Sequence, residues 1–245
     1  MDTEIISSRT NELVKKIKKL GERKYREKFG EYVAEGKRWV TDASRLCPQD
    51  ISATVRAQSC DYAAADFVLT DELFAEIAGT ENSQGILAVM KIPEAASEFS
   101  SDAVLLLDRI RDPGNMGTII RTAVAAGYRD IIANNCVDIY NPKVIRSSMT
   151  GILNINFAFD CDISAIKASG YRLIAADMAG ESVFSHKIPN GKLCLVIGNE
   201  ANGVSDDILS ECDCKVSIPM EKGIESLNAA VSAGILMYEL KFKNN

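Results

Sequence analysis

Histidine is almost absent from this sequence, and its scarcity excludes several kinds of active site. The chain of 245 residues contains one histidine, His186. A single histidine excludes metal sites built from histidine pairs and disfavours a serine–histidine triad. Its neighbourhood, SVFSHKIPNG, indicates a surface loop. The chain also lacks the G-x-G-x-x-G fingerprint, so a nucleotide-binding oxidoreductase or a kinase is disfavoured.

Paired cysteine motifs and long apolar runs are also lacking. The seven cysteines include no C-x-x-C pair, and the C-x-C pair of Cys212 and Cys214 has no second half. This pattern favours free thiols in a reducing cytoplasm over disulfides or zinc. The N-terminus has no apolar core typical of a secretion signal, and segment 227–240 is too short to span a membrane. We therefore expect a cytoplasmic protein with no metal and no membrane partner.

The charge of the chain is unevenly distributed. Residues 1–38 hold 11 Lys and Arg against 7 Asp and Glu, a net charge of +4, although the whole chain has a net charge of −6. The predicted helix near 13–20 has an apolar stripe of Leu13, Val14, Ile17 and Leu20. Its other face carries Lys15, Lys16, Lys18 and Lys19. These four lysines are candidate contacts for a polyanion such as RNA.

The pattern of apolar runs predicts two α/β regions. Strands are expected near 31–34, 53–58, 66–70 and 85–92, and residues 93–102 read as a linker that begins with proline. Beyond it, apolar runs at 103–107, 130–134, 153–159, 171–177, 192–198 and 214–220 alternate with helical patterns. Such alternation is typical of a parallel sheet covered on both faces, which binds ligands where its strands end.

Three of these strand ends carry unusual polar residues. After the first strand, Asn115 is placed to cap a helix that carries a lone cation, Arg121, among small and apolar residues. After the strand 192–198, Glu200 stands at the mouth of the sheet, and a capped helix start does not explain it. After the strand 214–218, the triplet Ser226-Leu227-Asn228 opens the last helix.

Together the three motifs resemble the SpoU (TrmH-type) branch of the SPOUT RNA methyltransferases over residues 100–245. The stretches EYVAEGKRWVTDA and SQGILAVMK are similar to the L30e-like substrate-binding extension of that family. The resemblance implies an L30e-like α/β domain at 1–92, a linker at 93–102 and a SPOUT domain at 103–245. This second domain would be a parallel sheet whose C-terminal segment threads a deep trefoil knot.

The resemblance also implies transfer of a methyl group from S-adenosylmethionine to a ribose 2′-hydroxyl of RNA. Arg121 would meet the phosphate beside the target ribose, and Glu200 would hold Arg121 or Asn115 in place. The implied catalytic residues are Asn115, Arg121, Glu200, Ser226 and Asn228. The implied cofactor-binding residues are Ala175, Ala176, Asp177, Gly180, Ile197, Gly198, Asn199, Ile218, Leu227 and Asn228.

The expected partners are RNA and a second copy of the chain, packed through the third motif. We expect RNA contacts from the four lysines and from Arg109, Arg111 and Arg146 on the methyltransferase domain. The added L30e-like domain favours 23S ribosomal RNA over tRNA. The alternatives are a tRNA enzyme, an antibiotic-resistance rRNA methyltransferase and a non-catalytic RNA-binding protein on the same fold.

Overall fold

The contacts of the chain divide it into two compact units in a computed structural model, which describes residues 4–185, 187, 191–223 and 226–242. Unit 1 consists of Met1–Glu94 and Tyr140–Leu153, and unit 2 consists of Ala95–Ile139 and Asn154–Asn245. His186 and residues 188–190 of its predicted loop lie outside the described residues. None of the described helices is long and apolar enough to cross a membrane.

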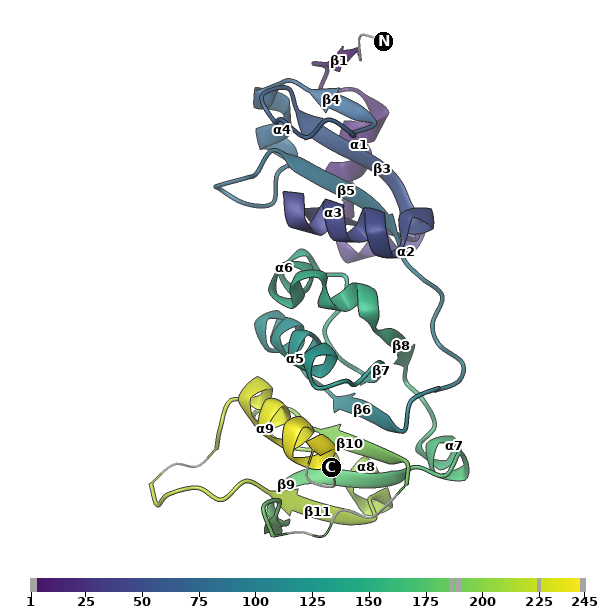
Figure 1. The fold of residues 1–245 in the computed structure, drawn as a ribbon, viewed down its shortest axis with the longest axis vertical. Helices are drawn as coiled ribbons and strands as arrows, with labels where there is room; N and C mark the ends of the chain where they lie inside the picture. Colours follow the sequence, from purple (N-terminus) through teal and green to yellow (C-terminus); the bar gives the residue numbers. More distant parts are fainter. Residues whose placement is uncertain (1–3, 186, 188–190, 224–225, 243–245) are drawn as a thin grey trace. The chain divides into compact units, whose positions relative to one another are not determined.

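Unit 1 is a five-stranded mixed sheet in the order β1-β4-β3-β5-β2, with helices on both faces (Figure 1). The helix α1 lies on one face, and its residues Val14, Ile17 and Leu20 are buried as the apolar stripe predicts. The helix predicted near 13–20 is confirmed as α1, which ends at Leu20, and a second helix, α2, begins at Arg23. The elements of this unit are β1 (Ile5–Ile6), α1 (Glu12–Leu20), α2 (Arg23–Phe29), β2 (Glu31–Glu35), α3 (Lys37–Leu46), η1 (Pro48–Asp50), β3 (Ile51–Ala57), β4 (Phe67–Leu69), α4 (Asp71–Ile77), β5 (Ile86–Lys91), α6 (Pro142–Ser148) and η2 (Met149–Asn154).

The segment Tyr140–Leu153 contacts unit 1 although it comes from the middle of the predicted SPOUT region. The ring of Tyr140 lies 4.9 Å from that of Tyr32, and the indole N–H of Trp39 donates a hydrogen bond of 3.1 Å to the carbonyl of Met149. These contacts bury the rings of Tyr32, Trp39 and Tyr140, and the sequence pattern alone does not show that these residues pack together. The domain boundaries 1–92, 93–102 and 103–245 stay a prediction.

Unit 2 is a six-stranded sheet in the order β11-β9-β10-β6-β7-β8, and all of its strand pairs are parallel. The predicted parallel α/β sheet is therefore confirmed, while the trefoil knot stays a prediction. The strand β6 is buried at every position, as its apolar run requires. The elements are β6 (Ala103–Asp108), α5 (Pro113–Ala125), β7 (Asp130–Asn134), β8 (Asn156–Phe159), α7 (Ile163–Ala168), β9 (Arg172–Ser182), β10 (Leu193–Ile197), α8 (Asp206–Glu211), β11 (Cys214–Ser217) and α9 (Ala229–Phe242).

Helices cover both faces of this sheet. Residues Ile166 of α7 and Ile208 of α8 join Val104 and Val196 in one apolar cluster on one face. The helices α5 and α9 pack against each other, and α9 also contacts β10. Because helices pack on both faces, the strands are held in place and their carboxyl ends have defined positions. The site residues lie on the loops that follow these ends.

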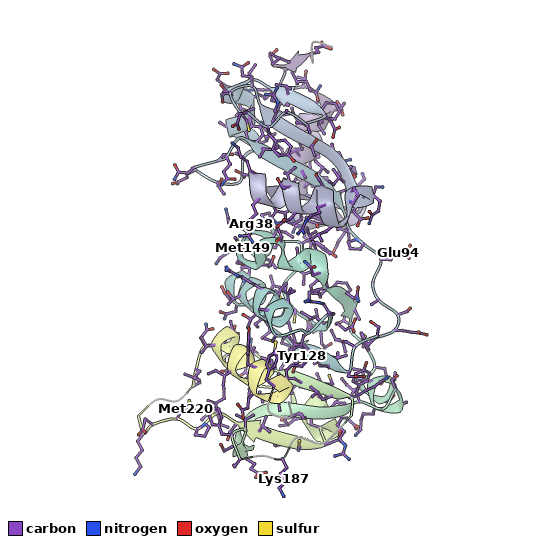
Figure 2. The ribbon with its side chains drawn as sticks, viewed as in Figure 1. Arg38, Glu94, Tyr128, Met149, Lys187 and Met220 are labelled. Atoms are coloured by element: carbon purple, nitrogen blue, oxygen red, sulfur yellow. The ribbon has the colours of Figure 1, made fainter. Side chains whose placement is uncertain are left out.

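One buried polar atom in unit 2 leads to a stability prediction. The side chain of Tyr128, labelled in Figure 2, is fully buried, and its hydroxyl has no hydrogen-bond partner among the described residues. Burial raises the pKa of this hydroxyl, so it stays protonated at neutral pH. An unsatisfied buried hydroxyl costs about 1–3 kcal/mol. We expect Tyr128→Phe to stabilise the fold by about 1 kcal/mol, allowing for the small void it leaves, as measured by urea unfolding. A lower midpoint for Tyr128→Phe would mean that the hydroxyl is satisfied in solution.

Candidate active site

The site residues stand where the strand order of unit 2 reverses. The strands β6 and β10 are neighbours, with Leu107 paired to Ile197 at their carboxyl ends. From β6 the chain continues through α5 to β7 on one side, and from β10 it continues through α8 to β11 on the other. The crevice between such diverging loops is the usual ligand site of an open parallel sheet.

A line of hydrogen bonds joins the three motifs at this position. The side-chain amide of Asn228 donates to Oδ1 of Asn115 at 2.9 Å. The amide of Asn115 in turn donates to Oε1 of Glu200 at 2.5 Å. These three residues lie 85 and 113 positions apart in sequence, so only the fold brings them together. We call this line the Asn–Asn–Glu relay.

The Glu200 carboxylate fixes the direction of the relay. An ionised carboxylate only accepts hydrogen bonds, so the NH₂ group of Asn115 must face it and the carbonyl of Asn115 must face Asn228. At the other end, Oδ1 of Asn228 accepts from the backbone N–H of Ala230 at 2.9 Å. Asn228 therefore caps α9. Each side chain of the relay therefore has one defined orientation, with Asn228 donating to Asn115 and Asn115 donating to Glu200.

Asn115 is not the cap of α5, contrary to the prediction. The helix begins at Pro113, and the side chain of Asp112 accepts from the backbone N–H of Asn115 at 2.7 Å. Aspartate is a strong N-cap because its carboxylate also meets the positive end of the helix. The side-chain amide of Asn115 therefore does not cap the helix. It donates its hydrogen bond to Glu200 instead.

A buried carboxylate, Asp108, connects the end of β6 to the loop after β10 through hydrogen bonds. Asp108 is fully buried and accepts from the backbone N–H of Ser205 at 2.8 Å and from the amide of Asn134 at 3.0 Å. The next residue, Arg109, has φ 57°, a conformation that residues other than glycine rarely adopt. Asn199 donates to its carbonyl at 3.0 Å, which helps to hold that turn. Sequence reasoning missed Asp108, although a carboxylate that ends a wholly apolar strand was a usable signal.

Arg121 lies apart from the relay. Its side chain is exposed, and no hydrogen bond or ion pair joins it to another described residue. It follows Asn115 by six residues, which places it about 9 Å further along the helix axis. In this structure Glu200 accepts a hydrogen bond from Asn115, and no hydrogen bond or ion pair joins it to Arg121. A solvent-facing guanidinium without a partner is available to bind an anion.

The predicted cofactor residues lie within β9, around the carboxyl end of β10, just after β11 and immediately before α9. The β9–β10 ladder ends at the pair Ala175–Val196, and Ile197 is buried, while Gly198, Ile218 and Leu227 are half-buried. These positions offer backbone groups and apolar side chains, which suit an uncharged heterocycle and its ribose. Ser226 is exposed.

The stretch Ala176–Gly180 is a bulge within β9 and not a separate loop. The register against β11 jumps from the pair Ala175–Lys215 to the pair Glu181–Val216. Within the bulge, Asp177 accepts from the backbone N–H of Ala179 at 2.8 Å. The bulge pushes its backbone out of the ladder toward the same strand ends.

Two glycines at these strand ends are required by the fold itself. A Cβ atom at Gly198 would lie 2.1 Å from the backbone carbon of Gly203, and one at Gly180 would lie 2.6 Å from that of Lys215. Both distances are far below van der Waals contact, so any side chain would displace the loop. These contacts explain why the fold needs glycine at both positions, while the predicted cofactor contacts of Gly180 and Gly198 stay a prediction.

The thiol of Cys136, beside the buried carboxylate of Asp108, is not activated. Cys136 donates hydrogen bonds to the carbonyls of Leu107 at 3.2 Å and Asn134 at 3.4 Å, beside the buried carboxylate. Burial raises the pKa of Cys136 to about 12, so it is protonated at neutral pH. Among the described residues, no group of three or more His, Cys, Asp or Glu could hold a metal ion.

The predicted RNA-binding cations have different surroundings. Lys15, Lys16 and Lys18 form ion pairs with glutamates in unit 1, and their side chains are 35–45% exposed. Such surface pairs are weak and can be replaced by phosphate. The Nε atom of Arg109 lies 3.2 Å from Oδ2 of Asp108, with which it forms an ion pair. The predicted RNA contacts of all these residues stay a prediction.

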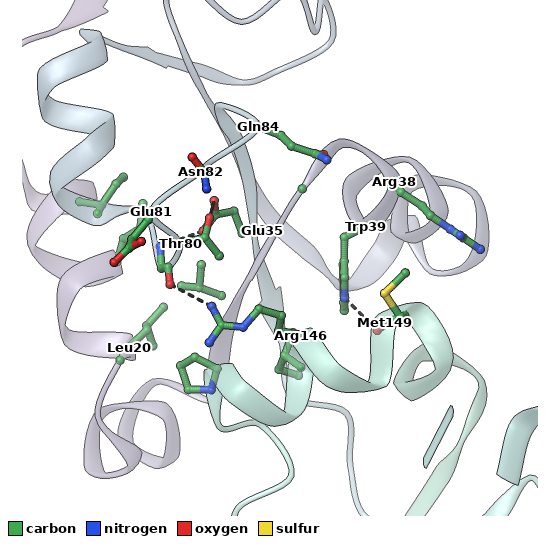
Figure 3. A pocket seen from close by; sticks show the side chains of 18 of the residues that line it. Leu20, Glu35, Arg38, Trp39, Thr80, Glu81, Asn82, Gln84, Arg146 and Met149 are labelled. Carbon is green, nitrogen blue, oxygen red and sulfur yellow. Dashed lines mark hydrogen bonds between the residues drawn. The ribbon is translucent and has the colours of Figure 1, made fainter. Parts of the chain in front are cut away.

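Arg146 belongs to unit 1, where it lines a cavity of about 760 Å³. Figure 3 shows its guanidinium pointing into this cavity beside Thr80 and Glu35. Arg146 donates to the carbonyl of Gly79 at 3.0 Å, and Glu35 accepts from Gly79 N–H at 2.8 Å and from the Thr80 hydroxyl at 2.7 Å. Arg146 and Glu35 therefore both hold the backbone around Gly79 at the edge of this cavity.

Comparison with known proteins identifies the family at this point. The model described as the SpoU rRNA Methylase family matches residues 102–238, which is more than half of the chain. The chain belongs to the SpoU rRNA methylase family. A second model, described as the MRM3-like substrate binding domain, matches residues 11–88. The resemblance drawn from the three motifs is therefore confirmed, and this SpoU-family chain is an RNA methyltransferase.

Individual relatives match the SpoU-family chain over nearly its whole length. A 23S rRNA (guanosine(2553)-2′-O)-methyltransferase, RlmP of Bacillus subtilis, is 29% identical and is covered to 98%, with 96% of this chain aligned. An rRNA methyltransferase from Sinorhizobium meliloti has a TM-score of 0.83 at 25% identity, with 97% of each chain covered. The SpoU methyltransferase AviRb from Streptomyces viridochromogenes has a TM-score of 0.83 at 26% identity, covering 96% of this chain and 99% of AviRb. Both solved structures contain S-adenosylmethionine, the cofactor that the sequence predicts for this family.

Proposed function

We propose that the chain transfers a methyl group from S-adenosylmethionine to a ribose 2′-hydroxyl of 23S ribosomal RNA. The observation that carries this proposal is the Asn–Asn–Glu relay, because it joins all three motifs at the switch point of the sheet. The name of the Bacillus subtilis relative supports both the 2′-hydroxyl and the 23S RNA. The bound cofactor of the Sinorhizobium and Streptomyces relatives supports the methyl donor.

The backbone-rich strand ends would hold the cofactor. Half-buried Ile218 and Leu227 would flank its adenosine, and the bulge Ala176–Gly180 would close over it. When bound, the cofactor supplies an electrophilic methyl group on a sulfonium. The chain then has to present the ribose oxygen in line with that methyl and to accommodate loss of the hydroxyl proton to solvent.

Arg121 would bind the phosphate next to the target ribose and stabilise the oxygen as negative charge develops on it. A guanidinium stays protonated in proteins, so Arg121 acts by positioning and electrostatics rather than as a base. The relay would place the amide of Asn115 against the same ribose. Glu200 acts through Asn115, which makes it a positioning residue.

A second copy of the chain would complete the site. The residues Val231, Tyr238 and Phe242 of α9 are 50%, 45% and 50% exposed, and they follow each other at helical spacing with half-buried Ile235. The opposite side of α9 is buried in unit 2. An uncovered apolar stripe on a helix that packs against α5, which carries Arg121, favours a homodimer formed through this face.

Disrupting this stripe should therefore yield monomers. We expect the wild-type chain to have twice the 26.7 kDa mass of one chain in light scattering, and Tyr238→Glu to have the mass of one chain. A buried unpaired carboxylate in a dimer interface costs several kcal/mol. The matched control is Phe159→Glu, because Phe159 is 44% exposed on β8 of the same unit. A dimeric Tyr238→Glu protein, or a monomeric wild type, would contradict the interface.

The choice of ribosomal RNA over tRNA is tested by direct competition. Purified protein is incubated with labelled S-adenosylmethionine and equal amounts of unmodified 23S rRNA and unmodified tRNA. We expect the label in the 23S rRNA. Label in tRNA would support the alternative tRNA enzyme, and RNA binding without label would support the non-catalytic alternative.

The same proposal places the protein in the cytoplasm. All seven cysteines are free thiols, which fits a reducing compartment, and the Bacillus and Sinorhizobium relatives are named as rRNA methyltransferases.

A further inference from the structure

The most basic part of this acidic chain surrounds two aromatic side chains. Residues 15–31 contain eight Lys and Arg against three Glu, a net charge of +5 in a chain of net charge −6. Within this segment, Tyr25 and Phe29 stand one turn apart on α2, with ring centroids 6.2 Å apart and planes inclined by only 15°. Phe29 is 39% exposed and Tyr25 is half-buried. We call these rings and the four lysines around them the aromatic–lysine patch: Lys16, Lys19, Lys24, Tyr25, Lys28 and Phe29.

The four ammonium groups lie close to the two rings. Lys24 and Lys19 lie 4.8 and 5.6 Å from the centroid of Tyr25. Lys16 and Lys28 each lie 5.9 Å from the centroid of Phe29. Cations over aromatic rings at these distances are attracted by the ring, but only weakly at an exposed position.

Much of this positive charge is not balanced within the unit. Lys16 is paired with Glu31, and Lys24 is paired with Glu22 at 2.8 Å. No ion pair joins Lys19 or Lys28 to a carboxylate among the described residues. Two parallel rings among long, mobile cations can accept planar groups on their faces while the ammonium groups move to neighbouring anions.

We propose that the aromatic–lysine patch binds an unpaired stretch of RNA, with bases stacked on Tyr25 and Phe29 and phosphates held by the lysines. Single-stranded RNA has both required features, because its bases are exposed and its backbone is anionic. The inference rests on the proposed function for the identity of the RNA as substrate. It shifts the predicted RNA contacts from the outer face of α1 to the junction of α1 and α2.

The test measures binding of the full-length protein to a labelled 12-nucleotide single-stranded RNA by fluorescence anisotropy, without cofactor. We expect the double variant Tyr25→Ala/Phe29→Ala to bind at least tenfold more weakly, since base stacking on aromatic rings is lost. Tyr25→Phe/Phe29→Tyr keeps two rings and should bind within twofold of wild type. The control Phe67→Ala removes a ring that is also 39% exposed in unit 1, and it should change nothing.

The lysines are tested through salt dependence. Replacing Lys16, Lys19, Lys24 and Lys28 by Gln should reduce the slope of log affinity against log salt by about 2 to 3, at about 0.7 per lost contact to single-stranded RNA. Unchanged RNA affinity in the Tyr25→Ala/Phe29→Ala variant, with unchanged thermal unfolding, overturns the proposal. Loss of binding to anionic phospholipid vesicles with unchanged RNA affinity would also overturn it and assign the patch to a membrane surface.

The methyl-transfer assay separates this inference from the proposed function. If wild type transfers methyl groups to rRNA and Tyr25→Ala/Phe29→Ala binds RNA normally, RNA binding by the aromatic–lysine patch is contradicted and the proposed function is supported. If wild type transfers no methyl group but its RNA binding depends on Tyr25 and Phe29, the function is wrong and the patch stands.

Discussion

We expect Arg121→Ala to lower the rate of methyl transfer by about 10³-fold and to leave the affinity for S-adenosylmethionine within about threefold of wild type. The exposed guanidinium lacks a partner among the described residues, so its removal leaves the fold of α5 intact. In the proposed function, the variant loses the cation that would face the developing charge and the neighbouring phosphate, an effect that reaches this size in other enzymes. Single-turnover transfer and calorimetric titration of the cofactor measure the two quantities separately.

Two further variants sharpen this prediction. Arg121→Lys keeps the charge without the planar pair of donors, so it should recover only part of the rate. Arg172→Ala removes an exposed arginine from the amino end of β9, away from the strand ends that carry the site, and it should transfer normally. Near-normal transfer by Arg121→Ala would remove this residue from the reaction.

Glu200→Gln should lower the rate about a hundredfold by releasing the relay. Glutamine can turn its own NH₂ group toward Asn115, so the direction of the two asparagine amides is no longer fixed. Loss of a hydrogen bond to a charged group accounts for an effect of this size. We expect the loss in kcat with little change in KM for the cofactor. The exposed Glu211→Gln on α8 serves as the matched control.

A double variant tests whether the relay, and not Glu200 itself, matters. Asn115→Asp alone sets two carboxylates against each other and should be as damaging as Glu200→Gln. In Asn115→Asp/Glu200→Gln, the new carboxylate can accept from both the introduced glutamine amide and Asn228, which restores both hydrogen bonds with the charge moved by one residue. We expect the double variant to exceed the Asn115→Asp rate about tenfold, so the two effects are not additive. Strict additivity would show that the two residues act independently.

Much of unit 2 could be predicted from the sequence because its strands are buried on both faces. Short apolar runs such as 103–107 are typical of fully buried strands, and their alternation with helical patterns predicts the parallel sheet. The positions of Asn115, Glu200 and Asn228 at strand ends were predicted for the same reason.

The contacts made through the fold could not be predicted in the same way. The choice of Asn115 over Arg121 as the partner of Glu200 depends on which face of α5 meets the loop after β10. The return of Tyr140–Leu153 to unit 1 depends on aromatic contacts 108 to 110 residues apart in sequence. The bulge at Ala176–Gly180 reflects a register shift against β11 that no local pattern encodes.

The most direct test of the central claim is the chemical position of the transferred methyl group. Unmodified 23S rRNA is labelled with S-adenosylmethionine carrying an isotopic methyl group, digested to nucleosides and separated by mass spectrometry. We expect label in one 2′-O-methylated nucleoside, with the adjacent phosphodiester resistant to alkali, and about 10³-fold slower labelling when Arg121→Ala replaces wild type. Label on a base, or transfer that does not depend on Arg121, would contradict the central claim.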